Sequence, residues 1–210
     1  MRAILLILML AAGALRAEGD RSGDFDYYVL ALSWSPGWCD REGNARKSAQ
    51  CGRGLGWSLH GLWPQYETGW PSYCATAEAP PSRAATGAMA DIMGTAGLAW
   101  HQWRKHGTCS GLSARAYYDL SRKAYGAVAR PDVFRRLQDP VRLPARVVEE
   151  AFLEANPALS ADGITVTCRD GQVQEVRICL TRALEPVTCG ADVVRDCTLD
   201  DALLVPIEGR

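Results

Sequence analysis

The chain has 210 residues, with 23 basic and 24 acidic side chains and a formal net charge of −1. This balance excludes non-specific attraction of the whole surface to nucleic acid, but it allows a local cationic pocket. The length suits one domain with a single hydrophobic core.

The N-terminal residues are typical of a removable export signal. Arg2 gives a positive start, and residues 4–15 are almost wholly apolar but too few to span a bilayer. Small residues between positions 12 and 17 offer cleavage sites. We therefore predict a signal peptide at residues 1–17, one domain at residues 18–210, and a periplasmic or secreted protein.

Cysteine is abundant for a chain of this length. An even number of cysteines behind an export signal indicates a disulfide framework, and the absence of any Cys-x-x-Cys pair from the sequence argues against a zinc site. Spacing alone leaves the pairing open. The eight positions are Cys39, Cys51, Cys74, Cys109, Cys168, Cys179, Cys189 and Cys197.

Two strands are predicted near the start of the domain. Residues 26–34 are mostly apolar and rich in β-formers, so we expect a buried central strand that ends in a turn at 35–39. Residues 40–56 are polar and glycine-rich, and we expect a loop there. A second, short strand is predicted at 57–60 and is expected to break at Gly61 and Pro64.

The middle of the chain is predicted to be helical. The predicted helices are a weak one at 84–93, then 98–106, 113–128, a short one at 132–137, and 144–155. Gly107 is expected to end the helix at 98–106, and Trp103 of that helix is expected in the core. Ser113 can cap the helix at 113–128.

The last third of the chain contains a hairpin signal. Residues 164–168 and 173–181 alternate in polarity around Asp170-Gly171, a pair that favours a tight turn. Residues 187–189 and 203–207 are expected as edge strands. Strands and helices do not alternate regularly, so the predicted class is α+β rather than doubly wound.

Histidine is rare and concentrated. Two of the three histidines lie in the segment His101–Ser110, and the third, His60, lies in Trp57–Pro64. An isolated histidine is usually a surface residue or a satisfied core residue. Finding all three in two short, tryptophan-containing segments favours a shared chemical role.

Helical spacing brings these side chains together. On a helix, His101 and Lys105 share one face, while Gln102 and His106 share the neighbouring face. One short helix can therefore present two imidazoles, an ammonium group and an amide to a single pocket, and Lys105 is one of only three lysines in the sequence.

Cleavage of an RNA phosphodiester fits this set of groups. The reaction needs a base for the ribose 2′-hydroxyl, an acid for the departing 5′-oxygen and positive charge for the transition state, and histidine can serve as base or acid near neutral pH. Metal binding is disfavoured, because the two histidines of the helix are five residues apart and Lys105 lies between them. A serine hydrolase is disfavoured too, because His60 replaces the last glycine of the nucleophile motif in residues 56–60.

The two histidine segments resemble the active-site segments of the ribonuclease T2 family, and Tyr27–Pro36 is similar to the first core strand of its bacterial members. The resemblance implies an α+β fold with a central antiparallel sheet and packed helices in one disulfide-stapled domain. It implies an endoribonuclease that cuts single-stranded RNA with little base preference, through 2′,3′-cyclic phosphates, without a metal or cofactor and usually with an acidic optimum.

The resemblance also implies roles for individual residues. His106 matches the general base and His60 the general acid. His101 matches the histidine that holds the phosphate, and Lys105 the cation that stabilises the transition state. Trp63 matches the aromatic residue that packs beside the reacting phosphate.

The same resemblance implies a pairing of the cysteines. Cys74–Cys109 matches the bridge that ties down the second histidine segment. Cys168–Cys197 enclosing Cys179–Cys189 matches the nested pair near the C-terminus, which leaves Cys39–Cys51.

One position departs from the family pattern. The second segment usually begins His-Glu, whereas here it begins His101-Gln102. A glutamine can donate a hydrogen bond or orient a neighbour, but it cannot exchange a proton. We expect activity that is retained but lowered, and lower pKa values for the adjacent imidazoles. The alternative is a catalytically weakened, secreted protein that binds RNA or is cytotoxic.

RNA-binding sites commonly stack bases on aromatic side chains. The candidates for base stacking are Trp34, Trp38, Trp70 and Tyr73. Packing in the core or against a disulfide is the other interpretation of each of them. Ser33 or Ser35 can add a polar contact to a base.

The expected partner is single-stranded RNA, and we expect a monomer with no obligate protein partner and no membrane anchor.

Overall fold

The computed structural model describes residues 20–208, so the predicted signal peptide lies outside the described residues. Within them, the helices are α1 (Ser35–Trp38), α2 (Arg83–Ala88), α3 (Ala90–Met93), α4 (Ala96–Lys105), α5 (Ala114–Ala127) and α6 (Arg146–Ala155). The strands are β1 (Tyr27–Trp34), β2 (Trp57–Gln65), β3 (Val141–Leu143), β4 (Ile164–Arg169), β5 (Gln172–Leu180) and β6 (Ala202–Leu204).

The strands form one sheet in the order β2-β1-β5-β6-β3, with β4 also paired to β5. The pairings are antiparallel except for a single parallel contact between β5 and β6. β1 lies between β2 and β5 and is buried along most of its length, as expected of a central strand. The predicted α+β class with a central, mainly antiparallel sheet is confirmed.

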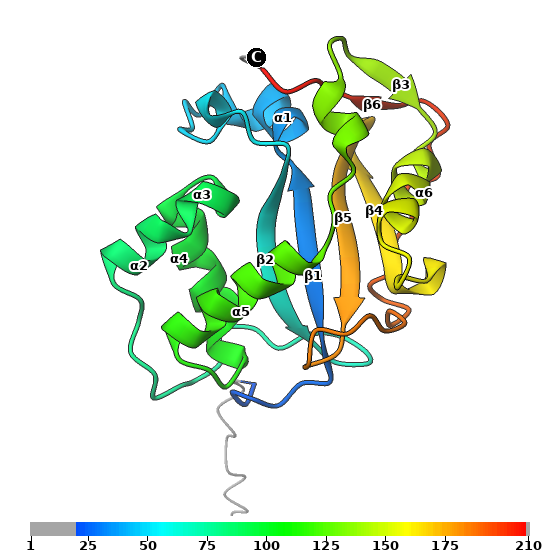
Figure 1. Cartoon of the computed structure of the whole chain (residues 1–210). Helices are drawn as coiled ribbons and strands as arrows, with labels where there is room; N and C mark the ends of the chain where they lie inside the picture. Colours follow the sequence, from blue (N-terminus) through cyan, green and yellow to red (C-terminus); the bar gives the residue numbers. More distant parts are fainter. Residues whose placement is uncertain (1–19, 209–210) are drawn as a thin grey trace, which may run out of the picture.

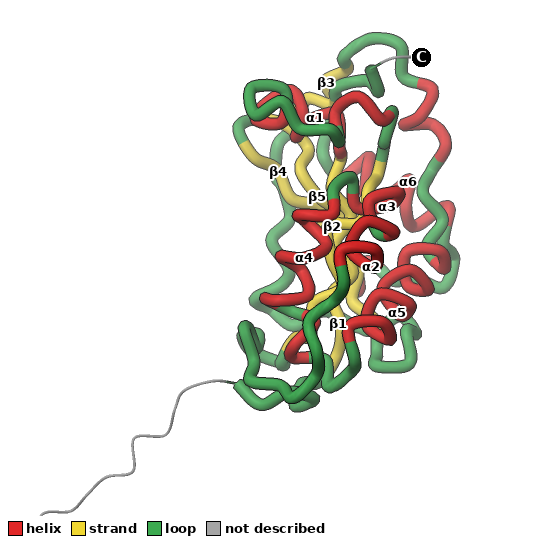
Figure 2. Tube along the Cα trace, turned by 90° about the vertical axis from the view of Figure 1, so that its left-hand side faces the viewer, coloured by secondary structure: helices red, strands yellow, loops and turns green. Residues whose placement is uncertain are grey.

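The two faces of the sheet are covered differently. Helices α5 and α6 lie on one side of the strands, and α2, α3 and α4 gather beside β2 (Figures 1 and 2). The main core lies on the side of α5 and α6, and it includes Leu30 and Leu32 of β1 together with Tyr117 and Phe152 of these helices. The opposite side has only a small apolar cluster around Val29, so it has room for polar side chains.

A β-bulge interrupts the pairing of β1 with β2. Ala31 lies opposite Gly61, and Leu32 lies opposite Leu59, so His60 is an extra residue without a partner. Bulges of this kind redirect side chains and are frequent next to active sites.

The bulge decides which side chains of β2 share a face. Residues three apart on a regular strand point to opposite faces. With one extra residue between them, Leu59 and Leu62 both reach the main core, and His60 and Trp63 both reach a cavity on the other side. The bulge therefore gathers the two functional candidates of this strand.

The predicted break of this strand at Gly61 and Pro64 is wrong, because β2 continues to Gln65. Gly61 is needed for close packing, since a Cβ atom there would overlap the amide of Gln102 and the indole nitrogen of Trp63. Pro64 is tolerated because β2 is an edge strand, where a missing N–H costs no ladder bond.

Several other predictions match the structure closely. Asp170 and Gly171 both have positive φ, 53° and 75°, as the predicted two-residue hairpin requires. The Oγ of Ser113 accepts a hydrogen bond from Ala116 N at the start of α5. Trp103 is only 2% exposed and lies in the core, as expected.

Other predictions need correction. The expected turn at 35–39 is the short helix α1, followed by a π-helical turn to Gly43. The weak helix at 84–93 is divided into α2 and α3 at Met89. Residues 187–189 are not a strand, and β3 was not predicted, because its three residues are too few to show an alternating pattern.

Four disulfide bridges join the cysteines in the pairing that the resemblance implied, and no cysteine is free in the described part of the chain. The bridges are Cys39–Cys51, Cys74–Cys109, Cys168–Cys197 and Cys179–Cys189. No helix among residues 20–208 is long and apolar enough to cross a bilayer.

Candidate active site

A cavity of about 320 Å³ lies where the face of β2 and β5 meets α4. All three histidines line it, together with Lys105 and Gln102, so the structure brings the predicted site residues together. The rest of its wall is formed by Val29, Trp63, Gln65, Trp70, Arg177, Asp192, Val193 and Arg195.

Helix α4 presents its side chains as the spacing predicted. Its N-terminus is capped by Thr95, whose hydroxyl accepts a hydrogen bond from Leu98 N. The helix ends at Lys105, and His106 is its C-cap residue. Gly107 follows because a Cβ atom there would overlap the ring of Trp103. The core side of the helix is thereby packed against the domain while its other side faces the cavity.

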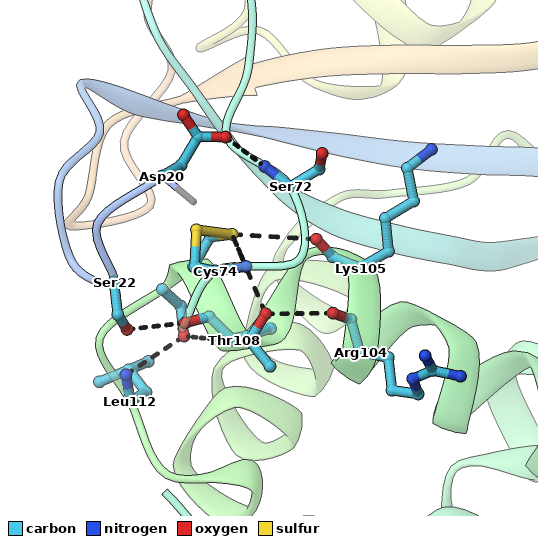
Figure 3. Close-up of a disulfide and its surroundings, with 11 residues drawn as sticks. Asp20, Ser22, Ser72, Cys74, Arg104, Lys105, Thr108 and Leu112 are labelled. Carbon is cyan, nitrogen blue, oxygen red and sulfur yellow. Dashed lines mark hydrogen bonds between the residues drawn. A yellow bond between two sulfur atoms is a disulfide. The ribbon is translucent and has the colours of Figure 1, made fainter. Parts of the chain in front are cut away.

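The end of α4 is tied to the preceding loop by the Cys74–Cys109 bridge (Figure 3). Two hydrogen bonds from backbone N–H groups reinforce it: Tyr73 N donates to the Lys105 carbonyl at 2.9 Å, and Cys74 N donates to Cys109 Sγ at 3.3 Å. The Lys105 side chain runs away from the bridge (Figure 3). The backbone that carries Lys105 and His106 is therefore fixed from outside the helix.

Trp63 is the contact point of the site. Its ring stacks on His106 at 5.2 Å and 25°, and it meets His60 edge-on at 5.2 Å and 79°. The indole N–H donates to Gln102 Oε1 at 2.7 Å, and the Arg177 guanidinium lies 5.4 Å from the ring centroid. The indole thus separates the two imidazoles and holds each at a defined angle.

His106 is held in its neutral form. The residue is only 5% exposed, and burial, followed by the positive charges of Lys105, His60 and His101, lowers the pKa of its imidazole to about 3. Its Nδ1 is buried and has no hydrogen-bond partner among the described residues. His106 is therefore unprotonated, and able to accept a proton, even in mild acid.

His101 shares this tendency in a more open position. Its side chain is exposed, and burial of part of the ring, together with the charges of Lys105, His60 and Arg104, lowers its pKa. His101 and Lys105 lie one helical turn apart at the mouth of the cavity, where they can contact an anion.

Sequence reasoning missed an acidic residue beneath the cavity. Glu175 of β5 is 2% exposed, and its Oε1 is hydrogen-bonded to His60 Nδ1. Ser33 Oγ also donates to Oε1, at 3.1 Å, and Arg177 donates to Oε2 through two N–H groups, at 3.1 and 2.9 Å. Burial raises the pKa of Glu175, but the hydrogen bonds and charges of His60 and Arg177 outweigh it and lower the pKa to about 2.

A weak signal for this pair exists in the sequence. Residues two apart on a strand share a face, so Glu175 and Arg177 had to lie together. The sequence does not reveal which strand pairs with the one that carries Glu175 and Arg177. Ser33 lies opposite Glu175 only because β5 pairs with β1, and that pairing joins segments 142 positions apart.

The four aromatic candidates lie in four different environments. Trp34 is fully buried, and its indole N–H donates to the Val205 carbonyl at 2.8 Å, so the prediction that it stacks a base is wrong. Trp70 is 51% exposed and lines the cavity. Tyr73 is 54% exposed but is not part of the cavity wall. Trp38 is half-buried, and its ring packs closely against Gly43 and its loop.

The polar candidates near the first strand are engaged inside the protein. Ser33 donates to Glu175, as described, and Ser35 is buried and accepts a hydrogen bond from Gln50 Nε2 at 2.9 Å. Neither hydroxyl lines the cavity. Their predicted contact with a base is therefore not supported by their positions.

The charges around the cavity suit an anion. Lys105, Arg177 and Arg195 line it, with Asp192 as the one carboxylate of the wall. Among residues 20–208, no group of three His, Cys, Asp or Glu side chains is placed to hold a metal ion. The cations can bind an anion, and the imidazoles of His106 and His60 can transfer protons to and from it.

Comparison with known proteins agrees with the family resemblance of the two histidine segments. The model of the ribonuclease T2 family matches residues 25–189. A ribonuclease of Aeromonas hydrophila is 34% identical over 224 aligned positions, which cover 96% of each chain. The structure of an RNase-related protein from Calystegia sepium superposes with a TM-score of 0.68 at 20% identity, over 87% of this chain and 98% of that one. RNase NT in complex with 5′-AMP superposes with a TM-score of 0.60 at 21% identity, over 88% and 98%.

Proposed function

The chain belongs to the ribonuclease T2 family, and on this premise we propose that it is an exported endoribonuclease that cleaves single-stranded RNA by transesterification, with little base specificity. The observation that carries the proposal is the placement of two imidazoles on either side of Trp63: His106, whose Nδ1 has no hydrogen-bond partner among the described residues, and His60, which is bound to a carboxylate. A phosphodiester in the cavity would meet a base and an acid in one site.

His106 is the general base of the proposed reaction. It takes the proton of the ribose 2′-hydroxyl while the 2′-oxygen forms its bond to phosphorus. Its lowered pKa, about 3, supports this role, because the imidazole stays neutral in mildly acidic solution. The same burial also makes His106 a weaker base. A larger fraction of the protein therefore has a neutral His106 at low pH, but each neutral imidazole has a lower affinity for the proton.

His60 is the general acid. It gives a proton to the 5′-oxygen as the bond between that oxygen and phosphorus breaks, which leaves a 2′,3′-cyclic phosphate and a 5′-hydroxyl. His101 and Lys105 hold the phosphate and stabilise the extra negative charge of the transition state. The proposed reaction uses no cofactor and no metal ion.

Two neighbours of the reacting groups complete the site. Trp63 packs beside the phosphate, and Gln102 orients the Trp63 ring by accepting a hydrogen bond from the indole N–H. Gln102 is 1% exposed and cannot exchange a proton, so its proposed role is positioning, with activity retained but lowered. Trp70 is the best-placed candidate for stacking a base, because it is exposed at the cavity wall.

Export is part of the proposal. Four disulfide bridges support an oxidising compartment, and residues 1–17 have the composition of a signal peptide. We propose a periplasmic or secreted monomer with no obligate protein partner.

Gln102 favours a second candidate function, a weakened secreted protein that binds RNA without efficient cleavage. The two candidates differ in a single-turnover experiment with a DNA oligonucleotide that contains one ribonucleotide. The enzyme cuts this substrate only on the 3′ side of the ribonucleotide and leaves an all-DNA oligonucleotide intact, and His106→Gln abolishes the cut. Binding without cleavage would support the second function, and cleavage of the all-DNA oligonucleotide would refute transfer to a 2′-hydroxyl.

A further inference from the structure

We propose that Glu175 is a positioning residue that fixes the tautomer of His60 and commits its Nε2 to proton donation. This inference rests on the proposed function, because it concerns the acid step of the same reaction. The juxtaposition that carries it is a buried carboxylate on β5 bound to the bulged histidine of β2.

The contact between Glu175 and His60 is unlike any other in the described part of the chain, where no other histidine contacts a carboxylate. Glu175 is nearly inaccessible to solvent. An ionised carboxylate accepts hydrogen bonds and donates none. His60 Nδ1 must therefore carry a hydrogen, and Nε2 is the ring nitrogen left to exchange a proton with the substrate.

Arg177 keeps the carboxylate charged throughout the proposed cycle. Its two N–H groups bind Glu175 Oε2, the oxygen that His60 does not use. When His60 gives up its proton, Glu175 still has a cationic partner, so no buried charge is left unpaired. An unpaired buried charge would be strongly destabilising.

The proton movement can be followed atom by atom. The Nε2 proton of the His60 imidazolium passes to the 5′-oxygen as the P–O5′ bond breaks, and the electron pair of that bond stays on the oxygen. The Nδ1 proton remains between the ring and Glu175, because the carboxylate has a pKa of about 2 and is a poor proton acceptor. Solvent then restores the Nε2 proton.

The charges around His60 make this contact important. The other ionisable side chains that line the cavity are His101, Lys105 and His106 of α4, Arg177 of β5, and Asp192 and Arg195. Most of these are cationic or can become so. Glu175 is the anion in direct contact with the His60 ring.

The same comparison explains why the two histidines differ. His106 has cations nearby, no carboxylate partner and a buried, unpartnered Nδ1. His60 has a carboxylate on Nδ1 and a partly exposed side chain. β5 thus supplies a carboxylate to only one of the two imidazoles that flank Trp63.

The test uses Glu175→Gln and two substrates that differ in their leaving group. One is a dinucleoside phosphate, whose 5′-oxygen needs a proton to depart. The other is a nucleoside 3′-(4-nitrophenyl phosphate), whose phenolate departs without one. The matched control is Glu42→Gln, which removes a carboxylate that is paired with Arg46 and Arg169 and does not line the cavity.

The expected result is a loss of roughly 10²-fold in kcat on the dinucleoside phosphate, within the usual contribution of a general acid. kcat on the nitrophenyl ester is unchanged, the basic limb of the pH profile moves to lower pH, and Glu42→Gln matches the wild type on both substrates. Equal losses on both substrates, or no loss on either, would overturn the role of Glu175.

Two further results keep the inference separate from the proposed function. A wild-type protein that cleaves neither substrate would refute the ribonuclease itself, whatever Glu175 does. If Glu175→Gln does not fold, ¹⁵N NMR of the wild-type protein decides the matter, because neutral His60 must carry its hydrogen on Nδ1. A neutral His60 with its hydrogen on Nε2 would overturn the inference.

Discussion

The burial of His106 makes a quantitative prediction about stability in acid. In the folded protein the pKa of His106 is lowered to about 3, from 6.5 for an unperturbed histidine. Between these values the unfolded chain binds a proton that the folded chain does not. The stability that depends on neutral His106 is therefore complete above about pH 6.5, and it falls as the pH falls toward 3. At pH 4.5 the loss is about 2.7 kcal/mol, from two pH units at about 1.36 kcal/mol each.

The perturbation is His106→Gln, which removes the titrating group and keeps a polar side chain. Urea unfolding of the wild type and the variant is measured at about pH 7 and pH 4.5 with the disulfides intact. Carboxylates such as Glu175 contribute to both proteins and cancel in the double difference. The wild type should lose about 2.7 kcal/mol more than the variant between the two pH values.

The matched control is His101→Gln, which removes a histidine from an exposed position on the same helix. Its double difference should be smaller, because the His101 ring is less buried. Equal pH dependence of the wild type and His106→Gln would refute the reasoning, since it would mean that the folded protein does not hold His106 neutral.

Three further predictions follow from individual contacts. Gln102→Glu keeps the acceptor for the Trp63 N–H and adds a negative charge. Turnover should rise, and the acidic limb of the pH–rate profile should move to higher pH, because an anion raises the pKa of His106. An unchanged profile would place residue 102 outside the chemistry. Gly61→Ala should lower the free energy of unfolding by about 1–3 kcal/mol and reduce activity through overlap with Gln102 and Trp63, whereas Gly126→Ala, an open position of α5, should be neutral or stabilising in the same urea titration. Replacing Cys74 and Cys109 together by alanine removes a bridge across 35 positions and should cost about 4 kcal/mol by the chain-entropy relation, and a thermal melt that does not shift would contradict it.

Local patterns in the sequence predicted much of this site correctly. His101, Gln102, Lys105 and His106 lie within six residues of one helix, so their relative directions follow from helical geometry alone. The Asp170-Gly171 hairpin is similarly local, because two residues with positive φ determine its turn. Predictions of this kind need no knowledge of the tertiary fold.

The remaining features depend on pairings between distant segments. His60 and Trp63 share a face only because of a bulge in β2, and a three-residue separation on a strand argues the opposite. Glu175 reaches His60 because β5 lies beside β1, which lies beside β2. The sequence contains Glu175 and Arg177 two positions apart but not the strand order that places them under the cavity.

The burial of aromatic residues shows the same limit. Trp34 and Trp70 both lie near a histidine segment or a strand end, and local sequence does not distinguish them. Trp34 is covered because Trp57, Phe134 and the Val205 carbonyl close around it. Trp70 lies in a loop beyond β2 and stays exposed.

The most direct test of the proposed function is the chemical identity of the ends produced from a short oligoribonucleotide. The protein is incubated with the oligonucleotide in mild acid and excess chelator, and the products are analysed by mass spectrometry at early times. We predict fragments that end in a 2′,3′-cyclic phosphate and begin with a 5′-hydroxyl, at a rate the chelator does not change. Fragments with 5′-phosphate ends, or cleavage that stops in chelator, would contradict metal-free transfer by His106 and His60.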